Sequence, residues 1–437
     1  MIPKKKDFLS WYKKIILDSG LAIESPIEGC AALLPYGYKL WERIKILLGK
    51  ELELLGYEDY YFPLFIPERF FKKNKEHFNG FFGEALSVSS VGHEKFAEPL
   101  FIRPTSEAII YPTLKKTLAG KNVHFPLRVN QWCSIVRWEK RKPTVPLIRD
   151  REFLWQEVHS LHTTAAGAKK ETEALLNVYE QFLKERLAIS TFKGIKPGRR
   201  KFPGAVETLA LETLSLENKS LQIATSHYLG DNFSKPYGLR YGGQYLFQSC
   251  AGMTTRLLGA IAAIHSDEKG LVMPPAVAPY EIGLAGKTSP AILKALNGIR
   301  ATKLGTEDDG IKRGIPLILK GNTIIRRDLM ERILVGKNIN QQIKTLLSDI
   351  QSTMLKRATI SQKSRITETS DRNVIREKVL YKKGGCVIPW CGNNECYFKL
   401  KKESGGSIRL VWKNKKTKPC VSCNKNTGWS ALFAQAY

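Results

Sequence analysis

Two short stretches of the chain combine charged and aromatic side chains at the spacing of β-strands. Residues 136–139 and 152–159 are rich in aromatic and apolar residues that alternate with polar ones, a pattern that predicts strands. Alternate side chains of a strand share one face. The first strand would therefore present Arg137 and Glu139 together, and the second would present Phe153, Trp155, Glu157 and His159. Two aromatic rings, a carboxylate and an imidazole suit a small ligand with an apolar ring and an ammonium group.

A basic segment joins these two predicted strands. Lys140, Arg141 and Lys142 begin it, and Arg149 and Arg151 end it. A cationic loop between two strands favours a polyanionic ligand such as ATP. Arg141 and Lys142 are more typical of surface-loop charges than of fixed ligands.

These residues also have ordinary structural interpretations. Trp155 and Phe202 are consistent with core residues, and His159 with a hydrogen-bonded core histidine. Thr105 and Ser106 precede a predicted helix and suit its N-cap. Spacing alone leaves the structural and the functional interpretations open.

Composition limits the partners of the protein. A chain of 437 residues usually holds two or three domains. Its net charge of +28 favours nucleic acid as a partner, with a membrane surface as the alternative. No apolar run approaches the ~20 residues that span a bilayer, and the N-terminal residues lack the apolar region of a signal peptide. We therefore expect a cytoplasmic protein without a membrane span.

The elements that must position these residues are mixed in type. Residues 1–35 are expected to form a short arm, and residues 67–97 an irregular surface. Helices are predicted at 36–56, 107–118 and 165–186, and strands at 60–65, 208–216 and 220–227. Residues 252–265 fit a strand or a helix that carries Arg256.

The pattern changes near residue 280. Strands are predicted at 280–285, 315–320 and 323–326, and helices at 290–297 and 338–357. Alternating strands and helices predict a small α/β domain, followed by a polar linker over 361–373. We expect three domains, at residues 1–279, 280–357 and 358–437.

The last part of the chain holds five of its eight cysteines. Cys391 and Cys396, followed by Cys420 and Cys423, have the spacing of a structural Zn²⁺ site with four thiolate ligands. A disulfide framework is the weaker alternative in a cytoplasmic protein. Cys386 has no predicted role.

Longer motifs follow one another along the whole chain. They are Gly29-Cys30, Pro35-Tyr36-Gly37-Tyr38 and Tyr61-Phe62-Pro63, then Arg103-Pro104-Thr105-Ser106-Glu107, then Arg137-Trp138-Glu139 with Trp155-Gln156-Glu157, then residues 225–235, and finally Thr254-Thr255-Arg256 with residues 270–275. In this order they resemble motifs 1 to 3 and the proline-site loop of prolyl-tRNA synthetases of the archaeal and eukaryotic type, which are class II aminoacyl-tRNA synthetases.

The resemblance implies an α/β (α+β) architecture. A class II antiparallel sheet flanked by helices would be followed by a small α/β anticodon-binding domain and a C-terminal zinc-binding α+β domain. It implies a homodimer, with the 36–57 helix and Pro63 at the interface. It also implies a proline–tRNA ligase that forms prolyl-adenylate from proline, ATP and Mg²⁺ and transfers prolyl to the 3′ end of tRNA(Pro).

The same resemblance implies roles for individual residues. Arg137 would hold the α-phosphate during catalysis and Arg256 the far end of the triphosphate. The ATP site would be completed by Glu139, Arg149, Gln222 and Thr225. The proline site would contain Thr105, Glu107, Arg137, Trp155, Glu157, His159, Phe202, His227 and Cys250, with the carboxylates of Glu107 and Glu157 on the imino nitrogen. Tyr437 would point toward the catalytic domain, so an extension after it should reduce activity.

Some features depart from the family pattern. Cys250-Ala251-Gly252 stands where the family typically has Ser-Trp-Gly, at the floor of the proline pocket. Residues 299–315 look shorter and more acidic than the family's anticodon-binding segment. Only 42 residues separate His159 from Phe202, too few for the editing insertion of bacterial-type relatives, so no editing in cis is expected.

Two other functions fit parts of the sequence. The changes at Cys250 and Ala251 suggest a catalytically silent, synthetase-like tRNA-binding or regulatory protein, but intact Arg137, Glu139 and Arg256 argue against it. The second is activation of another small amino acid, because a pocket sized for proline also admits cysteine and alanine.

Overall fold

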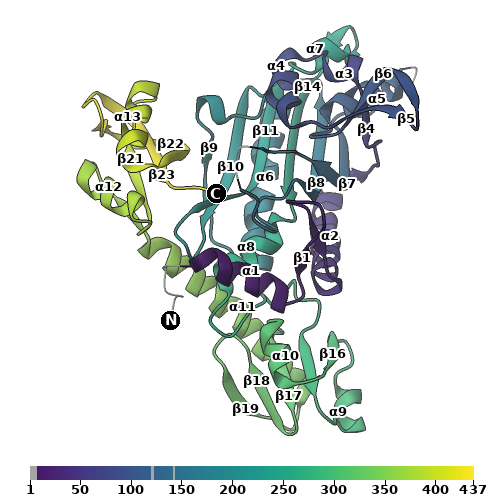
Figure 1. Ribbon diagram of the computed structural model, residues 1–437, viewed down its shortest axis with the longest axis vertical. Coiled ribbons are helices and arrows are strands. Elements are labelled where there is room, and N and C mark those ends of the chain that lie inside the picture. Colours follow the sequence, from purple (N-terminus) through teal and green to yellow (C-terminus); the bar gives the residue numbers. More distant parts are fainter. Residues whose placement is uncertain (1–6, 120–122, 141–142) are drawn as a thin grey trace.

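One large sheet organises the chain. The computed structural model describes residues 7–119, 123–140 and 143–437, so the predicted loop charges Arg141 and Lys142 lie outside it. The sheet has 11 strands (Figure 1), in the order β20 (Ile366–Glu368), β21 (Gly385–Pro389), β23 (Asn426–Ala434), β22 (Ser407–Pro419), β9 (Phe192–Ile195), β10 (Glu207–Leu214), β11 (Ser220–Gly230), β14 (Phe247–Thr254), β8 (Glu152–His162), β7 (Leu127–Val136) and β3 (Glu58–Asp59). From β9 to β7 every neighbouring pair is antiparallel.

Helices cover one face of this sheet. They are α6 (Ala165–Leu187), α8 (Arg256–His265), α1 (Phe8–Asp18) and α2 (Pro35–Leu54). Apolar residues of α6 share a buried cluster with Val158 of β8, and Tyr179 of α6 donates a hydrogen bond to Gln156 (2.8 Å). Because alternate side chains point to opposite faces, Trp155, Glu157 and His159 point away from α6. The antiparallel sheet flanked by helices and the shared face of β8 confirm the predictions.

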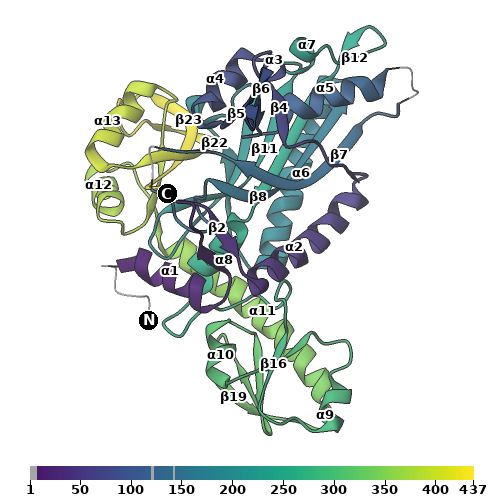
Figure 2. The same cartoon turned by 45° about the vertical axis from the view of Figure 1, so that its right-hand side comes forward.

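A smaller α/β unit follows. Its sheet has the order β16 (Ala301–Leu304), β15 (Ile282–Ala285), β17 (Leu317–Lys320), β18 (Thr323–Arg326) and β19 (Glu331–Leu334), and its helices are α9 (Pro290–Ala295), α10 (Glu307–Lys312) and α11 (Ile339–Ser364). In Figures 1 and 2 it lies at the lower end of the molecule. Buried Arg327 donates to both carboxylate oxygens of Asp267 at 2.7 Å and so ties this unit to the large sheet's domain.

The C-terminal part joins the large sheet directly. β20 to β23, with α12 (Arg372–Leu380) and α13 (Asn394–Ser404), form the yellow lobe of Figures 1 and 2. Val411 of β22 pairs with Ile195 of β9. Inside this junction, Arg409 donates two 2.9 Å hydrogen bonds to the buried carboxylate of Glu212, which Lys196 also contacts.

The remaining helices and strands lie outside the 11-stranded and the 5-stranded sheets. They are β1 (Ala22–Glu24), β2 (Ala31–Leu33), β4 (Phe65–Pro67), α3 (Glu68–Phe71), α4 (Lys75–Phe81), η2 (Phe82–Glu84), β5 (Ser87–Val91), β6 (Glu94–Ile102), α5 (Glu107–Leu118), η3 (Gly198–Arg200), α7 (Ser234–Tyr237), β12 (Arg240–Tyr241) and β13 (Gln244–Tyr245). No helix in the described part of the chain has the length and apolarity to cross a membrane.

Several predicted elements were wrong. The expected arm over 1–35 contains α1 and the β1–β2 hairpin, and the expected irregular surface over 67–97 contains short helices and the β5–β6 hairpin. The helical period of α1 was present in the sequence, in Phe8, Tyr12, Ile15 and Ile16, and was overlooked. The helices of 67–97 are too short to show a period. The expected linker over 361–373 is also partly regular, because α11 continues to Ser364 and β20 follows.

Two predicted strands, at 136–139 and 60–65, are only partly strands in the structure, each because of a hydrogen bond to a distant residue. β7 stops at Val136, because the Trp138 N–H turns to the main-chain oxygen of Glu84 (2.8 Å). Arg137 and Glu139 therefore follow the strand rather than lie on it. Residues 60–64 form no strand, since the Phe62 N–H is bonded to the Gln131 side chain (2.6 Å) and its carbonyl to Arg103 (2.7 Å).

Candidate active site

A cavity of about 200 Å³ lies on the face of the sheet opposite α6. It brings together every predicted ATP-site and proline-site residue except Thr105: Glu107, Arg137, Glu139, Arg149, Trp155, Glu157, His159, Phe202, Gln222, Thr225, His227, Cys250 and Arg256. Residues that lie far apart in the sequence therefore share one site.

One end of the cavity is built around the buried carboxylate of Glu157. Its oxygens contact the side-chain amide of Gln131 at 2.6 Å and the Nε2 atom of His159 at 3.1 Å. Burial alone would raise the pKa of Glu157, but the hydrogen bond and charge of His159, with help from Gln131, lower it below its usual value. A carboxylate therefore faces the cavity at neutral pH.

A second buried carboxylate, Glu107, begins α5. Thr105 donates a hydrogen bond to its Oε2 atom, and His77 Nε2 lies 3.6 Å from the same oxygen. The Cys250 thiol contacts the other oxygen at 3.8 Å. Thr105 thus lies behind Glu107 and orients it, rather than lining the cavity as predicted.

Aromatic rings form the wall of this end. The Phe202 and His227 rings lie 4.6 Å apart between centroids. Thr208 holds both, since its hydroxyl accepts from the Phe202 N–H (2.9 Å) and bonds His227 Nδ1 (3.0 Å). Burial, followed by the charges of His159 and Arg137, lowers the pKa of His227 to about 3, so this imidazole is neutral at pH 7.

The floor comes from β14. Cys250 is buried and pairs across the strands with His159 and His227. Burial and the neighbouring carboxylates raise the pKa of its thiol well above the usual value, so the thiol is protonated at neutral pH. A Cβ at Gly252 would lie 2.8 Å from the Gln156 main-chain oxygen, so the close approach of β14 to β8 requires glycine there.

The other end of the cavity is cationic. The Arg137 Nε donates to the Pro104 carbonyl (2.8 Å), and its guanidinium lies 5.1–5.7 Å from the ring centroids of Phe81, Phe153 and Trp155. Burial lowers the pKa of Arg137, and nearby carboxylates oppose this effect. An arginine held in this way remains charged, and the N–H groups of its guanidinium point in a fixed direction.

Two further arginines share this end. Arg256 donates to the main-chain oxygens of Ile148 (2.8 Å) and Gln222 (3.1 Å). Burial, followed by the charges of Arg149 and Arg137, lowers its pKa to about 10. Arg149 pairs with Glu139 at 2.6 Å. Three guanidinium groups around one cavity suit a polyanion.

Sequence reasoning missed several residues of this cationic end. Asp150, Arg200 and Lys201 also line the cavity. Burial raises the pKa of Asp150 to about 7. Arg149 also donates to the main-chain oxygen of Tyr437, so Tyr437 lies against the catalytic domain as expected. The basic character of residues 194–201 was the sequence signal that could have indicated Arg200 and Lys201.

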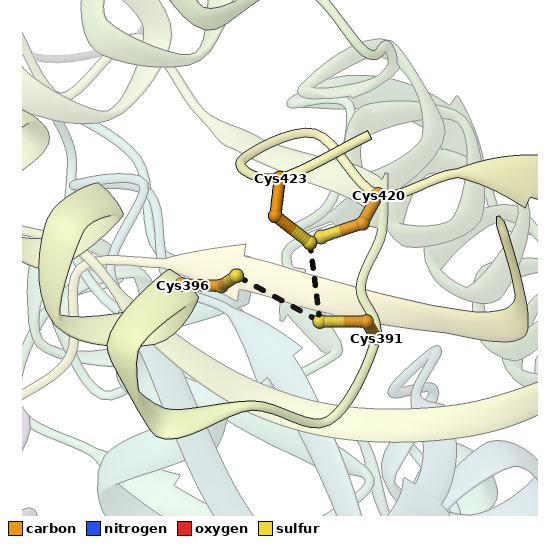
Figure 3. A group of neighbouring side chains, drawn as sticks. All are labelled: Cys391, Cys396, Cys420 and Cys423. Carbon is orange, nitrogen blue, oxygen red and sulfur yellow. Dashed lines mark hydrogen bonds between the residues drawn. The ribbon is translucent and has the colours of Figure 1, made fainter. Parts of the chain in front are cut away.

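The four cysteines predicted to bind zinc lie together in the C-terminal lobe. In Figure 3 the side chains of Cys391, Cys396, Cys420 and Cys423 point toward one another. Their sulfur atoms all lie within 4.8 Å of one another, with Cys391 at 3.7 Å from Cys396 and 3.8 Å from Cys423. Burial raises the pKa of Cys420, but main-chain N–H groups lower it to about 7. Four convergent thiols fit a tetrahedral Zn²⁺ site.

Comparisons with known proteins agree with this geometry. Residues 91–265 match the family described as tRNA synthetase class II core domain (G, H, P, S and T), and residues 376–437 match prolyl-tRNA synthetase, C-terminal. Curated proline–tRNA ligases from Borrelia garinii subsp. bavariensis and Clostridium novyi are each 34% identical to the chain; the alignments cover 99% and 100% of this chain and 99% and 98% of those proteins.

A solved structure is similar throughout. Prolyl-tRNA synthetase from Cryptosporidium parvum, in complex with halofuginone and AMPPNP, superposes with a TM-score of 0.90 at 30% identity, covering 100% of this chain and 99% of that one. Bacterial and eukaryotic proteins both match, so these comparisons do not separate the archaeal/eukaryotic type from others. Nothing in them supports a catalytically silent protein. The chain belongs to the prolyl-tRNA synthetase family and is an ATP-dependent proline–tRNA ligase with the class II fold.

Proposed function

We propose that the cavity forms prolyl-adenylate with the residue roles that the resemblance implies. The observation that carries this proposal is the polarity of the cavity. Two buried carboxylates, Glu107 and Glu157, line one end, and three arginines line the other. Proline is a cation at its nitrogen and an anion at its carboxylate, and ATP is a polyanion. The two substrates would therefore meet with the carboxylate of proline between them.

The carboxylate end selects a secondary amine. Glu157 and Glu107 accept hydrogen bonds from the two N–H groups of the prolyl ammonium, while Trp155 and Phe202 pack against the ring. His227 is neutral and adds no competing positive charge. Because the cavity walls are buried, these charge-assisted bonds are stronger than in water.

The cationic end acts by positioning and by electrostatics. The prolyl carboxylate attacks the α-phosphorus in line, and pyrophosphate leaves. Arg137 donates to the α-phosphate oxygens, where negative charge accumulates in the transition state. Arg256 and Arg149 bind the outer phosphates, and Glu139, Gln222 and Thr225 complete the ATP site. Glu139 and Asp150 offer the carboxylate oxygens that would hold Mg²⁺, which would neutralise phosphate charge.

The four-cysteine cluster is proposed to bind a structural Zn²⁺. A four-thiolate site closed to other ligands stabilises a small domain. Here it would join the loop after β21, α13 and the turn between β22 and β23.

The domain boundaries at residues 279 and 357 stay a proposal, and α11 passes through the second boundary without interruption.

Further proposals concern assembly and context. A homodimer is supported by apolar side chains that are exposed on α2 and just after it, including Leu54 at 85% and Tyr61 at 73%. We assign the protein to the archaeal/eukaryotic type and to the cytoplasm, where tRNA(Pro) is its macromolecular substrate.

Residues 160–201 are occupied largely by α6 and β9, which belong to the catalytic domain. This supports the absence of cis editing.

Calorimetric titration with proline tests the site. Glu157→Gln keeps the shape of the side chain but removes its charge. A charged hydrogen bond contributes about 1.5–3 kcal/mol, so the Kd for proline should rise at least about tenfold. Glu152→Gln, on the same strand but the opposite face, is the matched control. Equal proline affinity in Glu157→Gln and Glu152→Gln would refute the assignment.

A further inference from the structure

We propose that Glu107, His159 and Cys250 form a binding site for a single soft divalent cation such as Zn²⁺, and that this cation excludes proline from the cavity. One ligand atom from each residue lies within 4.8 Å of the other two. All three side chains are buried, with 2%, 2% and 4% of their surface exposed. The cluster is separate from the four cysteines of the C-terminal lobe.

Neighbouring groups already hold the histidine and the carboxylate in place. The Tyr111 hydroxyl is hydrogen-bonded to His159 Nδ1 at 3.1 Å, so Nε2, which contacts Glu157 at 3.1 Å, is the nitrogen that a cation would take in exchange for that contact. Thr105 holds one oxygen of Glu107, and the other faces Cys250 at 3.8 Å. Metal-binding histidines and carboxylates characteristically have such outer partners, which fix the ring and the carboxylate in place.

The chemistry of the three ligands determines which cation fits. A thiolate, an imidazole and a carboxylate together suit Zn²⁺ or a similar borderline-soft ion. Mg²⁺ prefers six oxygen ligands, so the Mg²⁺ used with ATP does not compete for this cluster. Three protein ligands leave one coordination position open to water. On binding, the Cys250 thiol releases its proton to solvent.

Competition with proline follows from the shared carboxylate, and this part rests on the proposed function. The prolyl ammonium and the metal ion are both cations that need Glu107. Two cations cannot share this buried oxygen pair, so each lowers the affinity of the protein for the other, by the same factor. The expected consequence is inhibition of proline activation by Zn²⁺ that excess proline relieves.

The test uses the full chain with its C-terminal cysteines already loaded with Zn²⁺. Co²⁺ is then added as the probe, because a cobalt–thiolate bond gives a charge-transfer absorption in the near ultraviolet. We expect one further equivalent of Co²⁺ to bind with this absorption, and saturating proline to abolish it. Cys250→Ser and Glu107→Gln should each lose the absorption. Cys133→Ser is the matched control, because Cys133 is a buried thiol that contacts a different carboxylate, Glu157, at 3.6 Å.

The outcomes separate this inference from the proposed function. No new absorption in the wild-type protein, or full absorption in Cys250→Ser, would overturn the metal site. An absorption that proline does not reduce would overturn the competition. Proline-dependent ATP–pyrophosphate exchange is measured in parallel without Co²⁺. If exchange is present and the absorption is not, only the metal inference fails. If exchange is absent, the proposed proline site fails on its own.

Discussion

Arg137→Lys is the substitution that most directly probes how the cationic end works. Lysine keeps the positive charge but loses the Nε bond to Pro104 (2.8 Å) and the planar contact with the rings of Phe81, Phe153 and Trp155. The ammonium group then has no fixed position at the α-phosphate. Removal of one preorganised donor costs about 2.7–4 kcal/mol in the transition state. The rate of adenylate formation should therefore fall about 100- to 1,000-fold.

The assay is single-turnover formation of prolyl-adenylate, with the KM for ATP and the melting temperature measured alongside. Because lysine retains the charge, the KM for ATP should change much less than the rate. Arg151→Lys is the matched control: Arg151 also bonds a main-chain oxygen (Glu28, 2.9 Å) and stacks on an indole (Trp138, 4.6 Å), but it is not among the residues that line the cavity. The reasoning is refuted if Arg137→Lys and Arg151→Lys form adenylate at similar rates.

The remaining predictions concern the metal cluster, the junction with the C-terminal lobe and the pH dependence of stability. Cys423→Ser should reduce the tightly bound zinc from one equivalent to none and lower the melting temperature; retention of the zinc in metal analysis would contradict the four-thiolate site. Glu212→Gln should cost about 3–5 kcal/mol in the free energy of unfolding, since it leaves two buried cations without a counter-charge, whereas Arg409→Met leaves Lys196 paired and should cost less; denaturant titrations that reverse this order would contradict the account. Because burial raises the folded-state pKa of Asp150 from 3.8 to about 7, the folded state binds more protons than the unfolded state between these values and loses stability as the pH rises through them; Asp150→Asn should remove that part of the slope in melting temperature against pH. A peptide tag fused after Tyr437 should raise the KM for ATP, because it disturbs the contact of Tyr437 with Arg149, and the same tag at the N-terminus serves as the control; equal KM values would show that the contact is unimportant.

Local patterns predicted the part of the site that lies on a regular element. The two-residue period of 152–159 correctly placed Trp155, Glu157 and His159 on one face, because strand geometry alone decides that point. The same reasoning failed at residues 136–139. The Arg137 N–H still bonds the Arg151 main-chain oxygen (2.7 Å), but the Trp138 N–H bonds Glu84, a residue more than fifty positions away, and the strand pairing ends there. No local period contains that information.

Other parts of the site depend on tertiary contacts that a sequence pattern does not record. The motif suggested that Thr105 contacts proline; its hydroxyl donates to Glu107, a contact that no pattern indicated, and the contact with proline stays a prediction. The 67–97 segment looked irregular, since its helices are only four and seven residues long. Its Phe81 nevertheless supports the Arg137 guanidinium. The cysteine cluster was predictable, because spacing restricts metal ligands more than it restricts ordinary core residues.

The decisive measurement is proline-dependent ATP–pyrophosphate exchange on the purified protein, with cysteine and alanine as competing amino acids. We expect strong exchange with proline. We expect weaker exchange with alanine and cysteine, which lack the secondary amine and the ring that the Glu107, Glu157 and Phe202 end of the cavity is built to hold. Exchange with none of the three amino acids, or exchange that is equal for proline and alanine, would contradict this expectation.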